Sequence, residues 1–283
     1  MYIYLSKPKT NKITFSTSFK NSILQRNTNV TSLDAVEFSS TLHYEGNDKH
    51  KYDVSIYWDF EQTEFYVNDK EFKTYPININ NNEYDEIFNF KLDKNFKDGM
   101  HTLLIVIQDR DFNSKKLTEL VASYNFIVGN SSITESSSNK ISSYIKSPFK
   151  IYTDEINYLN VVNNDFADSS QKYQHLRDYN KEKVLEVTPN TEIELAFRFK
   201  NFVNIGKQLT LFELNNNQIN IDNKPFLIYD LDSNIGFVYD KIKLTTPSEK
   251  GEYRLKSSII SNPYSENFSQ IYSPDFTYKL IVK

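Results

Sequence analysis

The sequence predicts an all-β protein made of two tandem β-sandwich domains, and three observations lead to this prediction. Aromatic residues make up 15% of the 283 residues and glycine is scarce. Aromatic and β-branched side chains suit the half-buried surface of a sheet. Apolar residues recur at every second position in short runs separated by polar turns, which favours sandwiches over alternating strands and helices. Finally, one strand–turn–strand pattern occurs twice.

The repeated pattern is the feature around which the chain is organised. Residues 92–108 read LDKNFKDGMHTLLIVIQ, and residues 244–260 read LTTPSEKGEYRLKSSII, 152 positions later. A period of this length matches a domain and not a short repeat. At this spacing the corresponding pairs are Leu92 and Leu244, Gly99 and Gly251, His101 and Tyr253, Leu103 and Leu255, Ile107 and Ile259, Tyr124 and Phe276, Phe126 and Tyr278, and Val128 and Leu280.

The composition between the two copies predicts the domain boundaries. Residues 130–147 are rich in serine and almost free of large apolar side chains, which is typical of a flexible linker. We therefore expect one β-sandwich over residues 1–129 and a second over residues 148–283.

In the first half, period-two alternation predicts most of the strands. Residues 35–44 place Val36, Phe38, Ser40 and Leu42 on one face. Residues 52–67 read as one long extended segment that contains the only tryptophan, Trp58, and residues 76–82 read as an asparagine-rich loop or edge because of Pro76. The other expected strands are 13–19, 86–92, 101–108 and 120–128.

The second half follows the same pattern with one irregular stretch. Residues 163–183 are polar and lack period-two alternation, and a short helix near 170–177 is one interpretation. The expected strands are 149–152, 156–162, 184–187, 192–199, 208–214, 225–229 and 235–244, followed by the repeated corner and the closing strand.

The repeated corner carries a resemblance to a known fold. Gly99 and Gly251 each stand two residues before a ring, His101 or Tyr253. Together with Trp58 in the third strand, this corner resembles the immunoglobulin-like or fibronectin-type sandwich. The resemblance implies that the ring is tied to backbone upstream, through a hydroxyl or an imidazole N–H. It therefore implies a structural role for His101, in place of general-base catalysis.

Charge and composition exclude several classes of function. The net charge is −4, with 33 basic and 37 acidic residues well mixed, so the basic stripe of a nucleic-acid-binding protein and the polybasic patch of a membrane-binding one are both missing. The absence of cysteine excludes disulfides, thiolate catalysis and cysteine zinc sites. Residues 1–5 are either a first strand or the remainder of a removed membrane anchor, which would be the only route to a membrane.

Two groups of side chains suggest metal sites. Asp109, Asp111 and Asn113 alternate after a strand, as oxygen ligands of calcium can, although no glycine follows where a calcium loop needs one. Calcium is the cofactor that this group suggests, and solvated charged turns are the simpler interpretation. The weaker groups are His43, Glu45, Asp48 and His50 for a transition metal, and Asp230, Asp232, Ser233 and Asn234 for calcium.

Two kinds of apolar surface suggest binding. The strand around Leu104 and Val106 is apolar on both faces, so its outer face needs a cover, for which packing of the second domain is the preferred hypothesis. Tyrosines in loops suit sugar or peptide binding because their rings are rigid and amphipathic. The candidates are Tyr75, Tyr84, Tyr173, Tyr179, Tyr264 and Tyr272.

No catalytic motif is present: the sequence has no phosphate-binding loop, no nucleophile elbow and no paired-histidine zinc motif. We therefore expect a non-catalytic, extracytoplasmic binding, adhesion or assembly module of a bacterial surface, with a protein or polysaccharide ligand and no nucleic acid. The alternative is a pair of carbohydrate-binding accessory domains of a secreted enzyme system, for which a row of coplanar aromatic rings would be diagnostic. A hydrolase with an unrecognised site ranks third.

Overall fold

Every regular element in the described part of the chain is a β-strand. The computed structural model describes residues 12–19, 28–30, 35–46, 49–81, 83–93, 98–110, 119–128, 143–148, 150–152, 183–200, 207–231, 237–261, 263, 271–272 and 277–283. The chain divides into two units, Met1–Ile133 and Thr134–Lys283. No described segment is a helix long and apolar enough to cross a membrane.

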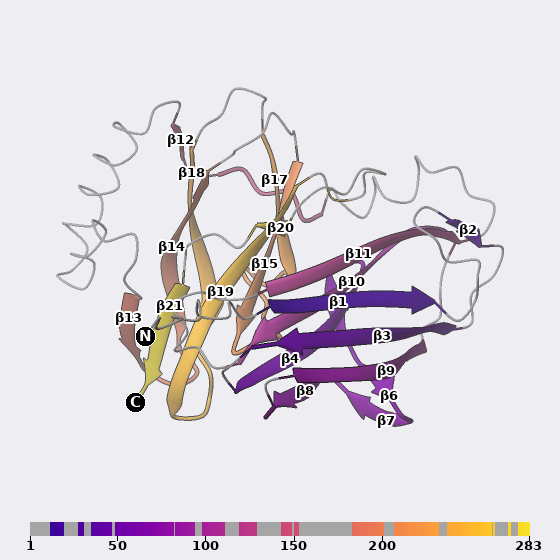
Figure 1. Cartoon of the computed structure of the whole chain (residues 1–283). Helices are drawn as coiled ribbons and strands as arrows, with labels where there is room; N and C mark the ends of the chain where they lie inside the picture. Colours follow the sequence, from indigo (N-terminus) through magenta and orange to yellow (C-terminus); the bar gives the residue numbers. More distant parts are fainter. Residues whose placement is uncertain are drawn as a thin grey trace, which may run out of the picture. The chain divides into compact units, whose positions relative to one another are not determined.

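The first unit contains two sheets (Figure 1). One has the strand order β1-β3-β9-β6-β7, and the other has the order β2-β11-β10-β4-β5 with β8 also paired to β4. The strands are β1 (Lys12–Phe19), β2 (Thr28–Val30), β3 (Ala35–Glu45), β4 (His50–Trp58), β5 (Glu61–Thr63), β6 (Phe65–Val67), β7 (Lys70–Phe72), β8 (Thr74–Ile79), β9 (Glu83–Asp93), β10 (Gly99–Asp109) and β11 (Glu119–Val128).

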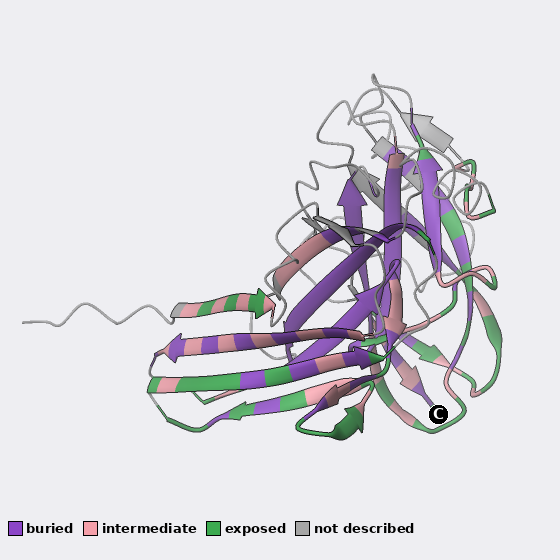
Figure 2. Ribbon diagram, turned by 90° about the vertical axis from the view of Figure 1, so that its right-hand side faces the viewer, coloured by how far each residue is buried: buried purple, intermediate pink, exposed green. Residues whose placement is uncertain are grey.

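The alternation expected along residues 35–44 is realised in β3, which pairs antiparallel with β1 and β9. Buried residues alternate with half-buried ones along the whole strand, which appears as banding in Figure 2. The buried set joins both sheets of the unit: Val36 and Phe38 belong to the same core cluster as Val54 of β4 and Leu103 of β10. The unit is therefore a sandwich whose core lies between its two sheets.

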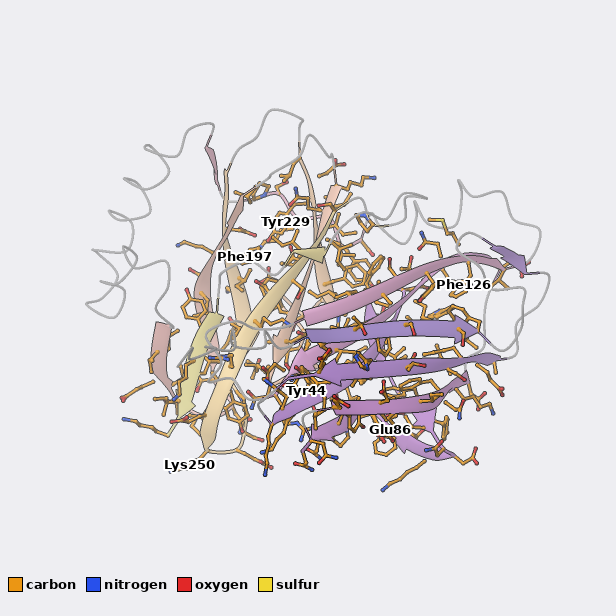
Figure 3. The ribbon with its side chains drawn as sticks, in the orientation of Figure 1. Tyr44, Glu86, Phe126, Phe197, Tyr229 and Lys250 are labelled. Atoms are coloured by element: carbon orange, nitrogen blue, oxygen red, sulfur yellow. The ribbon has the colours of Figure 1, made fainter. Side chains whose placement is uncertain are left out.

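The second unit also contains two sheets, with the orders β12-β18-β14 and β13-β21-β19-β15-β16. Its core joins Phe197 of β14, Phe212 of β15 and Tyr278 of β21. Figure 3 labels Phe197 and Tyr229, whose ring centroids lie 6.3 Å apart. The strands are β12 (Lys150–Tyr152), β13 (Lys183–Val187), β14 (Glu192–Lys200), β15 (Lys207–Leu214), β16 (Asn217–Gln218), β17 (Phe226–Asp230), β18 (Phe237–Thr245), β19 (Gly251–Ser261), β20 (Ile271–Tyr272) and β21 (Thr277–Val282).

The two units close in the same way. Gly99 opens β10 opposite Val128 of the last strand, and Gly251 opens β19 opposite Val282. In each unit the last strand also takes a short parallel partner, β2 on β11 and β13 on β21. The remaining sheets of the two units differ in their strand pairing. In the first unit β1 pairs with β3, whereas in the second β12 pairs with β18, so that β14 is an edge strand.

Three expectations need correction. Residues 52–67 are not one strand, because the chain turns back at Asp59 and Phe60. The closing strands align two positions away from the predicted spacing, so that Tyr278 and not Phe276 takes the place of Tyr124, each opposite the equivalent leucine of β10 or β19. At the end of the expected linker, Tyr144 and Lys146 hydrogen-bond to Ile228 of β17. The expected strand 156–162 and helix near 170–177 lie outside the described residues.

The two corner glycines differ in how well their positions would accept a side chain, and this difference gives a first prediction. Gly99 has φ of 141°, a conformation that L side chains avoid, whereas a Cβ on Gly251 would meet Tyr253 at an ordinary 3.5 Å. We expect Gly99→Ala to lower the free energy of unfolding of the first unit by at least about 1 kcal/mol, and Gly251→Ala to change that of the second by less than about 1 kcal/mol. Denaturant titration of both full-length variants measures the contrast, and equal losses would contradict it.

Candidate functional site

The turn after β4 is held to the repeated corner by hydrogen bonds that involve Asp59, and we call this set of contacts the clamp. Asp59 and Phe60 have φ of 50° and 67°, as a tight two-residue hairpin turn requires. The Asp59 backbone N–H donates to the Thr102 carbonyl at 2.8 Å, and the Thr102 N–H donates to Asp59 Oδ1 at 3.1 Å. The other carboxylate oxygen, Oδ2, lies 2.8 Å from His101 Nδ1. One aspartate thus fixes the turn, the corner and the ring together.

The second unit repeats this clamp with asparagine. Asn215 and Asn216 have φ of 48° and 62°, the Asn215 N–H donates to the Arg254 carbonyl at 3.0 Å, and the Arg254 N–H donates to Asn215 Oδ1 at 2.9 Å. Tyr253 takes a different partner from His101: its hydroxyl donates to the carbonyl of Glu249, upstream in the chain, at 3.0 Å. An amide has one acceptor oxygen where a carboxylate has two, so Asn215 lacks the second oxygen with which Asp59 contacts the ring of His101.

Sequence reasoning missed Asp59 and Asn215. The signal that could have found them is the pair of turn-forming residues directly after an apolar strand, Asp-Phe in one unit and Asn-Asn in the other.

His101 is held at the corner by two neighbouring side chains. The residue is 9% exposed, and its ring stacks on Trp58 with centroids 5.0 Å apart. Its Nδ1 is engaged with Asp59. The stacking on Trp58 and the contact with Asp59 together hold the ring in place at the corner.

The far end of the first sandwich gathers aromatic and acidic residues. Asp109 is 3% exposed and pairs in register with Tyr52, whose pKa is raised by burial first and then by Asp109 and Tyr44. His50 stacks on Tyr52, with centroids 5.8 Å apart, and lies 5.3 Å from the ring of Tyr44. Asp109 therefore belongs to the strand-end packing of this sandwich.

The metal hypotheses gain no support from the described residues, in which no group of three or more histidine, aspartate or glutamate side chains converges. His43 Nδ1 lies 2.7 Å from Asp85 on the half-buried face of β3, whereas His50 contacts Tyr44 on the core face, so the two imidazoles point to opposite sides. Asp111, Asn113 and Asp48 lie outside the described residues, as do Asp232, Ser233 and Asn234.

Two of the candidate tyrosines are core-edge residues. Tyr75 packs edge-on against Phe72 and Phe88, with centroids 4.9 and 5.5 Å away, and its pKa is raised by burial and by Glu86. Tyr84 donates a hydrogen bond to Glu86, and both rings pack against the core cluster. These rings do not form an exposed coplanar row. Tyr272 pairs through its backbone with Ile259, and Tyr173, Tyr179 and Tyr264 lie outside the described residues.

Two carboxylates converge in the second unit, but on a lysine. Lys146 Nζ lies 2.6 Å from Asp222 Oδ2 and 2.8 Å from Asp240 Oδ2, and it donates to the Lys241 carbonyl at 2.6 Å. Tyr229, fully buried, donates to Asp240 Oδ2 at 2.8 Å. The ammonium and the hydroxyl meet at Asp240 Oδ2, and the ammonium also contacts Asp222 Oδ2, so this group holds residues 143–148 against the second sandwich.

The buried tyrosines predict alkaline sensitivity. Burial and Asp240 raise the pKa of Tyr229 well above its usual value, so the native state keeps its proton where the unfolded chain loses it. The unfolded state then binds fewer protons, and the free energy of unfolding should fall as pH rises above about 10. Denaturant titrations of the full chain between about pH 8 and 11 test this. In Tyr229→Phe, the free energy of unfolding of the second unit should fall less steeply as pH rises. An unchanged dependence on pH would contradict the assignment of this sensitivity to Tyr229.

Both faces of β10 are buried, as its two-sided apolar sequence predicts. Leu103 and Ile105 belong to the core cluster, while Leu104 on the opposite face is 0% exposed and Val106 is 4% exposed. Tyr57, next to Leu104 in register, is also fully buried.

Unlike β10, the strand β1 carries exposed side chains. Among the described strands, β1 lies at the end of its sheet and pairs with β3 only. Thr14, Ser16 and Ser18 are exposed and the alternate residues are half-buried, so no residue from Ile13 to Phe19 is fully buried (Figure 2). Ile13 and Phe15 nevertheless pack against the core.

Comparisons with known proteins find no matching family model and no curated relative. Solved structures do match, among them a CARDB domain from Pyrococcus furiosus, determined with di-metal ions, at 12% identity and TM-score 0.28, over 44% of this chain and 97% of that one. The fibronectin(III)-like modules of Clostridium thermocellum CbhA match at 10% identity and TM-score 0.22, over 95% and 94% of the two chains. BcpA, the major pilin subunit of Bacillus cereus, matches at 12% identity and TM-score 0.27, over 96% and 67%.

Strand topology and the repeated corner define the class of protein: a tandem pair of immunoglobulin-like, fibronectin-type β-sandwiches. The fold predicted from the sequence is therefore confirmed. The same sandwich hosts many unrelated functions, so the function has to be argued from the surface.

Proposed function

We propose that the protein is a non-catalytic, extracytoplasmic module of a bacterial surface that binds or assembles through a sheet edge. The observation that carries the proposal is β1, an eight-residue edge strand with no charge between Ile13 and Phe19. Exposed backbone groups along such an edge are a ready template for another strand. Main-chain hydrogen bonds then supply the affinity, and alternate side chains supply specificity.

The other described edges support this choice because they carry the usual protections. β7 is three residues long and begins with Lys70 and Glu71, and β8 contains Pro76. In the second unit, β14 is an edge with four charged residues among nine. Proteins blunt exposed edges with charges, prolines and short strands, so the absence of these devices on β1 favours a use for its edge.

The ionisable groups support a non-catalytic role. His101 is engaged with Asp59, and the converging Asp222 and Asp240 hold Lys146. Each is explained by a structural contact, which leaves no described constellation with the geometry of a nucleophile and its base.

The proposal is tested by retention of the full chain on surface polymers, with separate polysaccharide and protein fractions of the cell envelope. We expect retention by a protein fraction and its loss in Thr14→Lys/Ser16→Lys, since both side chains are exposed and the lysines would protect the edge. Ile87→Lys on β9, at a 65% exposed position, is the matched control and should be retained normally. Retention by polysaccharide that is insensitive to the β1 lysines would favour the carbohydrate-binding alternative, and no retention would contradict both.

A further inference from the structure

We propose that the strand that pairs with β1 is β1 of a second copy of this chain, antiparallel and centred on Phe15. This inference rests on the proposed function, and it names the partner of the same edge. The result would be one continuous sheet across two copies, in which the outer strands β1 meet about a two-fold axis.

The distribution of polar and apolar side chains along β1 suits such a pairing. Thr14, Ser16 and Ser18 point to the exposed side, while Ile13, Phe15 and Phe19 lie half-buried against the core. A two-fold antiparallel pair keeps each side chain on its own face, so the apolar row continues across the join and the hydroxyl row stays in water. The flank of Phe15, half-buried in one copy, would be covered by Phe15 of the second.

Charge permits this register. A two-fold pair centred on one residue places residues at equal distances before and after it opposite one another. Like charges directly opposite one another in such a pair are destabilising. Centring on Phe15 sets Lys12 opposite Ser18, Ile13 opposite Thr17 and Thr14 opposite Ser16, with no like-charge pair.

The symmetry supports a second copy as the occupant. A two-fold interface uses the same patch on both partners and must be self-complementary. β1 meets that condition because its seven residues from Ile13 to Phe19 carry no charge and alternate strictly between the two faces. Joined by one strand pair alone, the interface is small, so the association should be weak and depend on concentration.

Cysteine cross-linking tests the register, because the chain has no cysteine of its own. The probes are Thr14→Cys and Ser16→Cys, at exposed positions where substitution spares the core. In the proposed register, residue 14 of one copy faces residue 16 of the other, with Cβ atoms about 5 Å apart, close to disulfide geometry. Residue 14 lies about 7 Å further along the strand from its own counterpart, which is too far.

We therefore expect disulfide dimers when the two full-length variants are mixed and oxidised, and few dimers from either variant alone. Adding Thr17→Lys to both variants, or diluting the mixture, should reduce the yield, while Ile87→Lys should leave it unchanged. Dimers from each variant alone at the yield of the mixture would indicate a parallel pairing and overturn the proposal. No dimers in any sample would overturn it as well, while retention that is lost in Thr14→Lys/Ser16→Lys would leave the proposed function standing with a different partner.

Discussion

Asp59→Ala should destabilise the first unit by about 3–5 kcal/mol, the largest effect that we expect of any single substitution outside the hydrophobic core. The change removes the acceptor of the buried Thr102 N–H and the acceptor that faces His101, each worth about 1–3 kcal/mol. It also places alanine at φ of 50°, where an L side chain other than Asn or Asp costs about 1 kcal/mol or more.

The fluorescence of Trp58 measures this loss in the full chain, because it is the only tryptophan and stacks on His101. Asp59→Asn is the matched control. It copies Asn215 of the second unit, keeps an acceptor for Thr102 and tolerates the turn, so it should cost about 1–3 kcal/mol. Equal losses for alanine and asparagine would show that the clamp contributes little.

Asp240→Ala should destabilise the second unit by about 2–4 kcal/mol. The carboxylate is 4% exposed and accepts from both the Lys146 ammonium and the buried Tyr229 hydroxyl, and removing one partner of a buried charged pair is costly. Asp222→Asn is the matched control and should cost about 1 kcal/mol, because asparagine tolerates the φ of 51° and keeps an acceptor for the Lys243 N–H, while water can reach this side chain, which is 23% exposed.

The same pair of variants tests the role of Lys146 in holding residues 143–148. Limited proteolysis of the full chain should cut near this segment faster in Asp240→Ala than in Asp222→Asn. Identical cleavage rates with unchanged stability would contradict the assignment of Asp240 as the principal anchor.

The fold was predictable because alternation in the sequence reflects burial directly. Val36, Phe38, Ser40 and Leu42 were expected on the inner face of one strand, and each is fully buried. The break after Trp58 was not predictable from this signal. Phe60 is also fully buried and continues the period of two, although the chain has already turned.

The alignment of the closing strands was wrong for a related reason. A shift of two residues leaves every side chain on the same face of a strand, so the hydrophobic pattern cannot distinguish Tyr278 from Phe276 as the counterpart of Tyr124. Hydrogen-bond register decides the matter, with Leu103 opposite Tyr124 and Leu255 opposite Tyr278.

The site residues were less predictable than the fold. Asp59 and Thr102 lie 43 positions apart, and their contact depends on strand register and on the turn conformation. Lys146 meets Asp222 and Asp240 from three separate segments, which no local pattern reveals. Tyr75 and Tyr84 were expected on loops, but they lie on β8 and β9, where their rings complete the edge of the core.

Amide hydrogen exchange along β1 tests the central claim, that this edge is used for pairing, most directly. In an antiparallel strand, alternate amides point to opposite neighbours, and β1 has β3 on one side only. In dilute protein we expect one alternate set of β1 amides to be protected and the other to exchange freely, and the free set to gain protection as concentration rises or as the surface-protein fraction is added. A free set that exchanges at the same rate under every condition would contradict the claim.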